Sequence, residues 1–140
     1  MTVQIPLSQT ALAPDQDGGA GSHEIAPDIA YLKTTLVNVV FLGLRNAGDG
    51  GWVLVDTGIP GSAGKIRDVA DARFGSGARP AAIVMTHGHF DHVGALETLS
   101  KEWDVPVYAH GLERPYLDGS AAYPPGDPSV GGGLMARIAP

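Results

Sequence analysis

The sequence Thr86-His87-Gly88-His89-Phe90-Asp91-His92-Val93-Gly94 places three histidines and one aspartate within six positions, directly after an apolar segment. His87 and His89 are two residues apart, so on an extended segment both rings project to the same side. Asp91 and His92 follow where the pattern becomes helical, and a helix N-terminus favours an ionised carboxylate. The spacing therefore predicts a metal site, in which His87 and His89 share one cation while Asp91 and His92 serve a second.

The donor atoms of this stretch indicate the kind of metal. Imidazole nitrogen and carboxylate oxygen suit zinc or another borderline divalent metal such as manganese, iron or cobalt. Thiolate ligands are excluded because the sequence contains no cysteine. The structural alternative is a surface turn that binds metal adventitiously. Four ligands at fixed spacing after a buried strand favour the metal site.

The pattern His-x-His-x-Asp-His resembles the signature of the metallo-β-lactamase-fold hydrolases. Val53-Leu54-Val55-Asp56-Thr57-Gly58 is similar to the family's strand ending in Asp-Thr-Gly, and Val105-Pro106-Val107-Tyr108-Ala109-His110 is similar to the strand after the metal motif. The likeness covers roughly residues 25–119. It implies an α/β fold, namely the N-terminal half of a four-layer αββα arrangement, with a mixed sheet and two helices on its outer face.

The resemblance also implies roles for the motif residues. His87 and His89 would bind a first metal, and Asp91 and His92 a second. Asp91 would in addition be catalytic, by orienting the nucleophile or protonating the leaving group. The implied cofactor is zinc, as one or two ions, with iron or manganese as alternatives. The implied activity is hydrolysis of a small ester, thioester or lactone by water that the metal makes nucleophilic.

Two other classes of function stay open at this point. Some relatives are iron-dependent sulfur oxidoreductases. His89 disfavours their diiron electron-transfer type, which usually has Glu there, but is compatible with mono-iron sulfur dioxygenases. The third class is a non-catalytic metal-binding fragment, because the family's distant histidines and bridging carboxylate are not recognisable after His92, where only His110 remains. Stoichiometric iron with oxygen uptake would favour the oxidoreductase.

Asp56 and His110 are candidates for residues that support the metal ligands. By resemblance, Asp56 would hydrogen-bond near the metal loop and fix the orientation of a ligand. Asp-Thr-Gly is also good turn chemistry in its own right, so Asp56 could simply satisfy a turn backbone. His110 ends a strand expected beside the metal loop, where it could line the site or cap the strand end.

The composition narrows the classes of partner. The chain has 140 residues and a formal net charge of −6, and its 9 lysines and arginines are spread singly. The lack of a basic stripe disfavours nucleic acid and favours a small-molecule substrate. The N-terminus does not look like a secretory signal, and the longest apolar run, residues 36–44, is too short to cross a bilayer. We therefore expect no membrane association and a cytoplasmic location.

The order of elements follows from periodicity and turn residues. A polar, glycine-rich break at residues 14–22 predicts an N-terminal arm over residues 1–24, followed by a metallo-β-lactamase-like domain over 25–140 that is truncated at its C-terminus. Strands are expected within 29–44, 52–56, 81–85 and 105–110. A helix should begin after Ser62 and end at Gly75, and another should follow the metal motif. From Tyr123 onward a surface loop is expected.

Ligand counting predicts weak activity for these 140 residues alone. Each proposed metal has only two protein ligands here, whereas a catalytic zinc usually has three, so zinc affinity and turnover should be low. The inner sheet face should also lack a partner sheet, which favours self-association; we assign to it Val37, Val39, Phe41, Val53, Val55 and Ile83. We would measure zinc affinity by titration, turnover with ester and lactone substrates, and self-association by light scattering. A soluble monomer with tight two-metal binding and normal turnover would contradict it.

Overall fold

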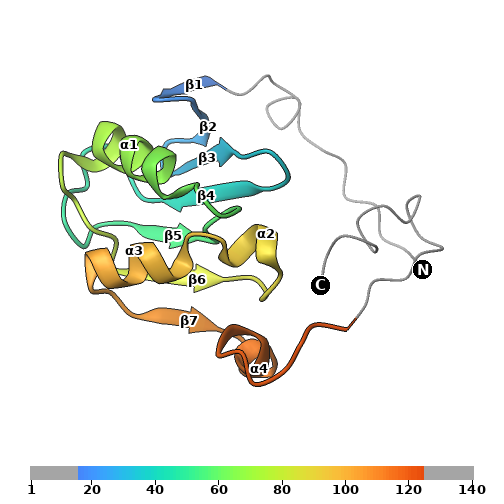
Figure 1. Cartoon of the computed structure of the whole chain (residues 1–140). Coiled ribbons are helices and arrows are strands. Elements are labelled where there is room, and N and C mark those ends of the chain that lie inside the picture. Colours follow the sequence, from blue (N-terminus) through green and yellow to red (C-terminus); the bar gives the residue numbers. More distant parts are fainter. Residues whose placement is uncertain (1–15, 125–140) are drawn as a thin grey trace, which may run out of the picture.

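A single mixed sheet organises the computed structural model, which describes residues 16–124 (Figure 1). Its strand order is that of the chain, β1 to β7. Neighbours from β1 to β5 are antiparallel, whereas β5, β6 and β7 are parallel. The strands are β1 (Gln16–Gly19), β2 (Ser22–Ala26), β3 (Ile29–Lys33), β4 (Asn38–Leu42), β5 (Val53–Val55), β6 (Ala82–Met85) and β7 (Val107–Ala109).

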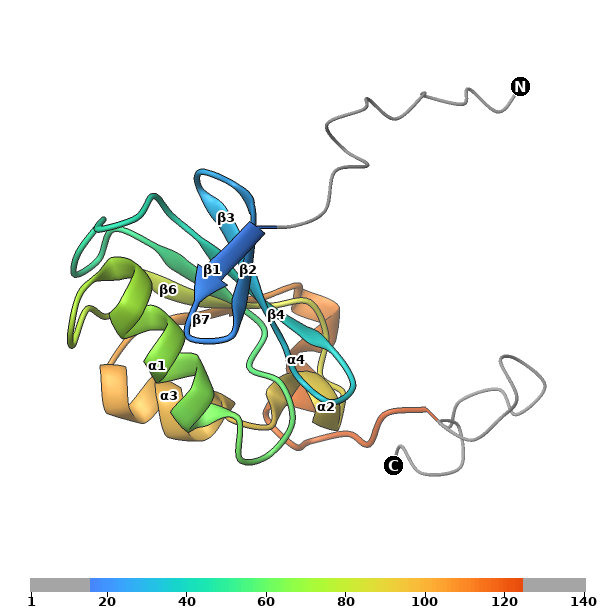
Figure 2. The ribbon, with the colours of Figure 1, turned by 90° about the horizontal axis from the view of Figure 1, so that it is seen from above.

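Two helices cover the same face of this sheet (Figure 2). They are α1 (Ala63–Phe74), which connects β5 to β6, and α3 (Leu96–Trp103), which connects β6 to β7. Both crossovers join parallel strands and advance in the same direction across the sheet, and the right-handed rule then places both helices on one side. The predicted architecture, a mixed sheet with two helices on its outer face, is confirmed.

The core lies between the sheet and these two helices. Leu54 and Ile83 are fully buried on the helix-facing side, and they are flanked in the sheet by buried Phe41. The rings of Trp52 and Phe74 stack with centroids 4.4 Å apart. Offset aromatic pairs of this kind add to the stabilisation from burial. The helix contribution to the core is Ile66, Val69, Ala70 and Phe74 from α1 and Leu99 and Trp103 from α3.

The inner-face assignment made from the sequence is partly wrong. Val53 and Val55 lie on the face without helices, as assigned, and are partly buried. Val39, Phe41 and Ile83 instead face the helices and are fully buried. The register pairs Val55 with Val40 and with Val84, so these valines form one row on the face without helices. Side chains alternate between faces, so the register decides the face, and the sequence did not supply that register.

The predicted N-terminal arm differs from the structure from Gln16 onward. Strands β1 and β2 form a bulged antiparallel hairpin at the edge of the sheet, and Gly19, Ala20 and Gly21 adopt positive φ at its turn. Glu24 anchors the hairpin, because its carboxylate accepts a hydrogen bond from Arg45 and pairs with the buried Arg73 of α1 at 3.3 Å. The glycine-rich break is therefore a hairpin turn rather than a linker. Residues 1–15 lie outside the described part.

The segment after the metal motif forms two short helices rather than one. Helix α2 spans Phe90–Val93, and α3 starts at Leu96. The break occurs at Gly94, whose N–H donates to the carbonyl oxygen of Gly58 at 2.7 Å. A Cβ at position 94 would lie 2.1 Å from the carbonyl carbon of Ile59, so only glycine allows this contact. The close approach fixes the metal motif against the loop after β5.

After β7 the chain forms two short helical elements that were not predicted from the sequence. A 3-10 helix, η2 (Gly111–Glu113), leads directly into α4 (Arg114–Leu117). The loop predicted from Tyr123 onward lies almost entirely outside the described residues. Among the described residues, no helix combines the length and apolar character needed to cross a bilayer.

Adjacent residues of β5 test the assignment of faces. Leu54→Ala should lower the free energy of unfolding by about 2–5 kcal/mol, because Leu54 is fully buried against the helices. Val55→Thr, on the open face, should cost about 1 kcal/mol or less. Urea denaturation followed by tryptophan fluorescence measures both values. Equal losses in the two variants would contradict this orientation of β5.

Candidate metal centre

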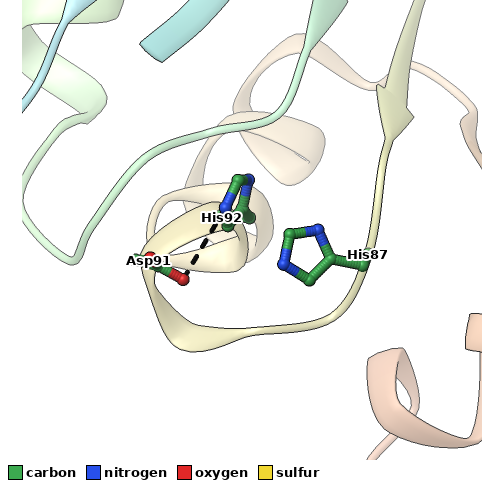
Figure 3. A group of neighbouring side chains, drawn as sticks. All are labelled: His87, Asp91 and His92. Carbon is green, nitrogen blue, oxygen red and sulfur yellow. Dashed lines mark ion pairs between the residues drawn. The ribbon is translucent and has the colours of Figure 1, made fainter. Parts of the chain in front are cut away.

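The metal motif lies at the C-terminal ends of β5 and β6. These strands are parallel, so their following loops meet at one edge of the sheet, which is where open α/β sheets commonly bind ligands. His87 is on the segment that leaves β6, and Asp91 and His92 are in the first turn of α2. Figure 3 shows the ring of His87 turned toward His92, with Asp91 beside His92. Strand and helix thus bring their side chains to one place.

Three of the four predicted ligands converge. One ligand atom each from His87, Asp91 and His92 lie within 4.8 Å of one another. The rings of His87 and His92 have centroids 4.0 Å apart, and Nε2 of His92 is 3.8 Å from Oδ1 of Asp91. Such separations are on the order of twice a ~2 Å metal–ligand distance. One divalent cation could therefore contact all three side chains.

His89 lies beside this group rather than within it. Its ring is 4.9 Å from that of His87, in a T-shaped arrangement, and 3.9 Å from the ring of Tyr123. The grouping differs from the sequence expectation, in which His87 and His89 share one cation while Asp91 and His92 serve another. The physical reason is the turn of α2, which carries His92 back toward His87.

Asp56 joins the two motifs by hydrogen bonds. Its carboxylate accepts from the N–H of Thr86 at 2.8 Å, from the Thr86 hydroxyl at 2.7 Å, and from Nδ1 of His92 at 2.7 Å. Asp56 is only 4% exposed and adopts φ 61, a left-handed conformation that Asp tolerates better than most residues. Of the two interpretations of Asp56, this geometry favours the one in which it orients a ligand.

These bonds also fix the protons on both histidines. A carboxylate only accepts, so Nδ1 of His92 carries the proton that it donates to Asp56. The Thr86 hydroxyl gives its proton to Asp56, so it accepts from Nδ1 of His87, 3.0 Å away. Each ring is left with Nε2 as its free lone pair. Burial, followed by His92 and His89, lowers the pKa of His87, which favours the neutral ring that a metal needs.

Thr57 and Gly58 hold the backbone of the motif. The N–H and the hydroxyl of Thr57 both donate to the carbonyl oxygen of His92 at 2.8 Å, and the side chain of Thr57 is fully buried. Gly58 accepts from Gly94, as described above. Asp-Thr-Gly is thus more than turn chemistry, because each of its residues bonds to the metal motif or to Thr86.

His110 is at the end of β7, where it caps the helix that follows. Its Nδ1 accepts a hydrogen bond from the N–H of Leu112 at 3.2 Å, and the side chain is exposed. The ring also lines a hollow of about 590 Å³ between α3, β7 and α4. The hydrogen bond of His110 is thus made to the backbone of η2 rather than to the strand end, and His110 is not in the group of His87, Asp91 and His92.

Sequence reasoning missed several residues that touch the motif. Thr86 and Gly94 are within the quoted stretch but were given no role. Glu113 and Tyr123 lie far from the motif in the sequence. Burial and a hydrogen bond to Glu113 raise the pKa of Tyr123 to about 12, so its hydroxyl stays protonated and donates. An uncharged turn threonine gives no local signal, and a distant carboxylate shows its role only once the chain has folded.

Comparison with known proteins identifies the family. The model of the metallo-beta-lactamase superfamily matches residues 32–137, which is more than half of the chain. The chain therefore belongs to this superfamily. It is 45% identical over 122 residues to the probable metallo-hydrolase YflN of Bacillus subtilis (strain 168), and 43% identical over 61 residues to the probable metallo-hydrolase YqgX of the same organism.

Solved structures agree on the fold. The structure of BJP-1, a subclass B3 metallo-beta-lactamase of Bradyrhizobium japonicum, superposes with a TM-score of 0.59 at 26% identity, covering 80% of this chain and 40% of that one. The match to YflN covers 87% of this chain and 46% of YflN, and that to YqgX covers 44% and 25%. The chain thus spans less than half the length of each of these proteins.

Replacing Asp56 tests whether it orients the ligands. In Asp56→Asn the amide group can turn an N–H toward His92. Nδ1 of His92 would then accept instead of donating, and the ring proton would move to Nε2, which could no longer bind a metal. We expect metal affinity to fall about 10- to 100-fold, as for other residues that hydrogen-bond a ligand. Isothermal titration with zinc measures the loss. Asp49→Asn is the matched control, because Asp49 pairs with Arg79 on the surface; equal affinity in both variants would contradict the role.

Proposed function

We propose that this chain carries the metal-binding half of a hydrolase that uses zinc to activate water against a small ester, thioester or lactone. The observation that carries the proposal is the convergence of ligand atoms of His87, Asp91 and His92 within 4.8 Å. Nδ1 of His92 is hydrogen-bonded to Asp56, and Nδ1 of His87 is bonded to the Thr86 hydroxyl, which in turn donates to Asp56. Membership of a superfamily whose relatives are named probable metallo-hydrolases supports it.

The donor set fits a borderline divalent metal. Two neutral imidazoles and one carboxylate are ligands that zinc accepts readily, and iron or manganese are alternatives. When bound, such a cation supplies Lewis acidity, which lowers the pKa of water toward 7 and polarises a scissile carbonyl. No rearrangement of the histidines is needed beforehand, because both already present Nε2 as a free lone pair.

The residues of the chain divide the remaining work. His87 and His92 hold the cation, and Asp56 keeps their rings oriented through Thr86 and the direct bond to His92. His89, one ring away from His87, is positioned to bind a second cation or to contact the substrate. Asp91 combines a ligand role with a catalytic one, in which its second oxygen orients the water and carries a proton to the leaving group.

The partners that we propose are a small-molecule substrate and a second copy of the chain. A net charge of −6 without a basic stripe disfavours nucleic acid, and it also gives no means of binding an anionic membrane surface. Self-association would use the half-exposed row of Val40, Val55 and Val84 on the face without helices. A cytoplasmic location is part of the same proposal.

Metal analysis combined with activity assays tests the proposal. The metal-free chain is titrated with zinc, manganese and ferrous iron, and then assayed with p-nitrophenyl acetate, an acyl thioester and a γ-lactone. We expect zinc to bind and to support slow hydrolysis that His87→Ala abolishes. His23→Ala is the matched control, because His23 stacks on Tyr31 in the β2–β3 pair.

Two outcomes would contradict the proposed function. Stoichiometric iron together with oxygen uptake would indicate the sulfur oxidoreductase class. Zinc binding unaffected by His87→Ala, or no hydrolysis with any of the three metals, would leave a non-catalytic metal-binding fragment as the better description.

A further inference from the structure

The segment after β7 returns to the metal motif at Gly88, between the first two histidines. The N–H of Gly88 donates to Oε2 of Glu113 at 3.0 Å. The same oxygen accepts from the hydroxyl of Tyr123 at 2.7 Å. One carboxylate oxygen of η2 therefore connects the backbone of the motif with a tyrosine that lies ten residues further on.

The tyrosines of this segment pack over the same peptide. The ring of Tyr123 lies 3.9 Å from that of His89 and 4.3 Å from that of Tyr116. A Cβ at position 88 would be 2.9 Å from Cβ of Tyr116 and 3.4 Å from Cε2 of Tyr123. Position 88 therefore requires glycine, because the tyrosines occupy the space of a side chain.

We infer that Glu113, acting with Tyr123, is a positioning residue that fixes His87 and His89 for metal binding by holding the intervening Gly88. This inference rests on the proposed function, because it assigns a purpose to the metal ligands named there. The metal motif is then held by two segments of the chain. Asp56, after β5, bonds to Thr86 and His92, and Glu113, after β7, bonds to Gly88.

Gly88 is the residue between the two histidines whose backbone cannot be restrained by a side chain of its own. Glycine loses more conformational freedom on ordering than any other residue. A hydrogen bond from an N–H to a carboxylate is stronger than one between neutral groups, so a single contact of this kind can restrain the peptide. Ordering Gly88 before the metal arrives lowers the entropy lost on binding.

Glu113 is placed as a support and not as a ligand. Its Oε2 already accepts from two donors, and it does not belong to the group of His87, Asp91 and His92 whose ligand atoms converge. The ring of Tyr123 likewise contacts the ring of His89, at an interplanar angle of 42°, while its hydroxyl donates to Glu113. Both residues therefore act on the metal site through His87-Gly88-His89.

The test compares Glu113→Ala with Glu113→Gln in the full chain. Gln keeps an oxygen that can accept from both donors, whereas Ala removes the acceptor. Glu97→Ala is the matched control, because Glu97 is an exposed helix residue paired with Lys101. Three quantities are measured: hydrogen exchange of the Gly88 amide in the metal-free protein, the dissociation constant for zinc, and the thermal midpoint of the metal-free protein.

We expect Glu113→Ala to accelerate Gly88 exchange at least about tenfold and to weaken zinc binding about 10- to 100-fold, with the midpoint close to that of the control. Glu113→Gln should restore both properties to within about threefold of the wild type. Tyr123→Phe keeps the ring and loses only the hydroxyl, so it should give an intermediate loss of affinity.

The inference is overturned if Gly88 exchange in Glu113→Ala equals that of Glu97→Ala, or if zinc affinity is unchanged although exchange is faster. A parallel loss of affinity and thermal midpoint that Gln does not restore would also overturn it, because that pattern indicates a general structural role. Failure of the proposed function is distinguishable. In that case the wild type itself binds no zinc, while the exchange comparison still decides whether Glu113 holds Gly88.

Discussion

The buried carboxylate of Asp56 is the interaction on which the site depends. It accepts from the backbone and hydroxyl of Thr86 and from the ring of His92, so one side chain joins the end of β5 to the loop after β6 and to α2. A buried carboxylate is stable only when its oxygens are well bonded, and here the bonds come from the residues that must be oriented. The requirement for satisfying a buried charge and the requirement for ordering the ligands are therefore met by the same contacts.

The topology of the sheet brings Asp56 and the metal motif to the same edge. Because β5 and β6 are parallel neighbours, the loops that leave them start side by side at one edge. Thr57 and Gly58 then bond to the carbonyl oxygen of His92 and the N–H of Gly94, so the first turn after the motif cannot continue as one helix. These bonds explain the break between α2 and α3. Asp91 and His92 therefore lie on a separate short helix near the C-terminal end of β6, not on the face of one long helix. The metal motif is thus shaped by the loop after β5 as much as by its own sequence.

Periodicity and motif spacing predicted the parts of the structure that are decided locally. Helix α1 has Ile66, Val69 and Phe74 on its buried face, as its spacing indicates, and the strands before both motifs are where apolar runs place them. The face of Val39, Phe41 and Ile83 was wrong because strand register depends on pairing. Strands β1 and β2 were missed because a glycine-rich turn resembles a linker until Glu24 meets Arg73. The support from Glu113 had no sequence signal, since it exists only when η2 lies against Gly88.

The grouping of ligands has a consequence for the order in which the site assembles. Ligand atoms of His87, Asp91 and His92 already lie within 4.8 Å of one another, and the ring protons of the two histidines are arranged by hydrogen bonds that need no cation. The ring of His89 packs on that of Tyr123 and is 4.9 Å from the ring of His87, outside the group of three ligands. A first cation would therefore bind with little reorganisation, and the contact between the rings of His89 and Tyr123 occupies neither ring nitrogen of His89. His87 and His89 are equivalent in the sequence motif but differ in their contacts. His87 is oriented by its hydrogen bond to Thr86, which bonds to Asp56, whereas the ring of His89 packs on that of Tyr123.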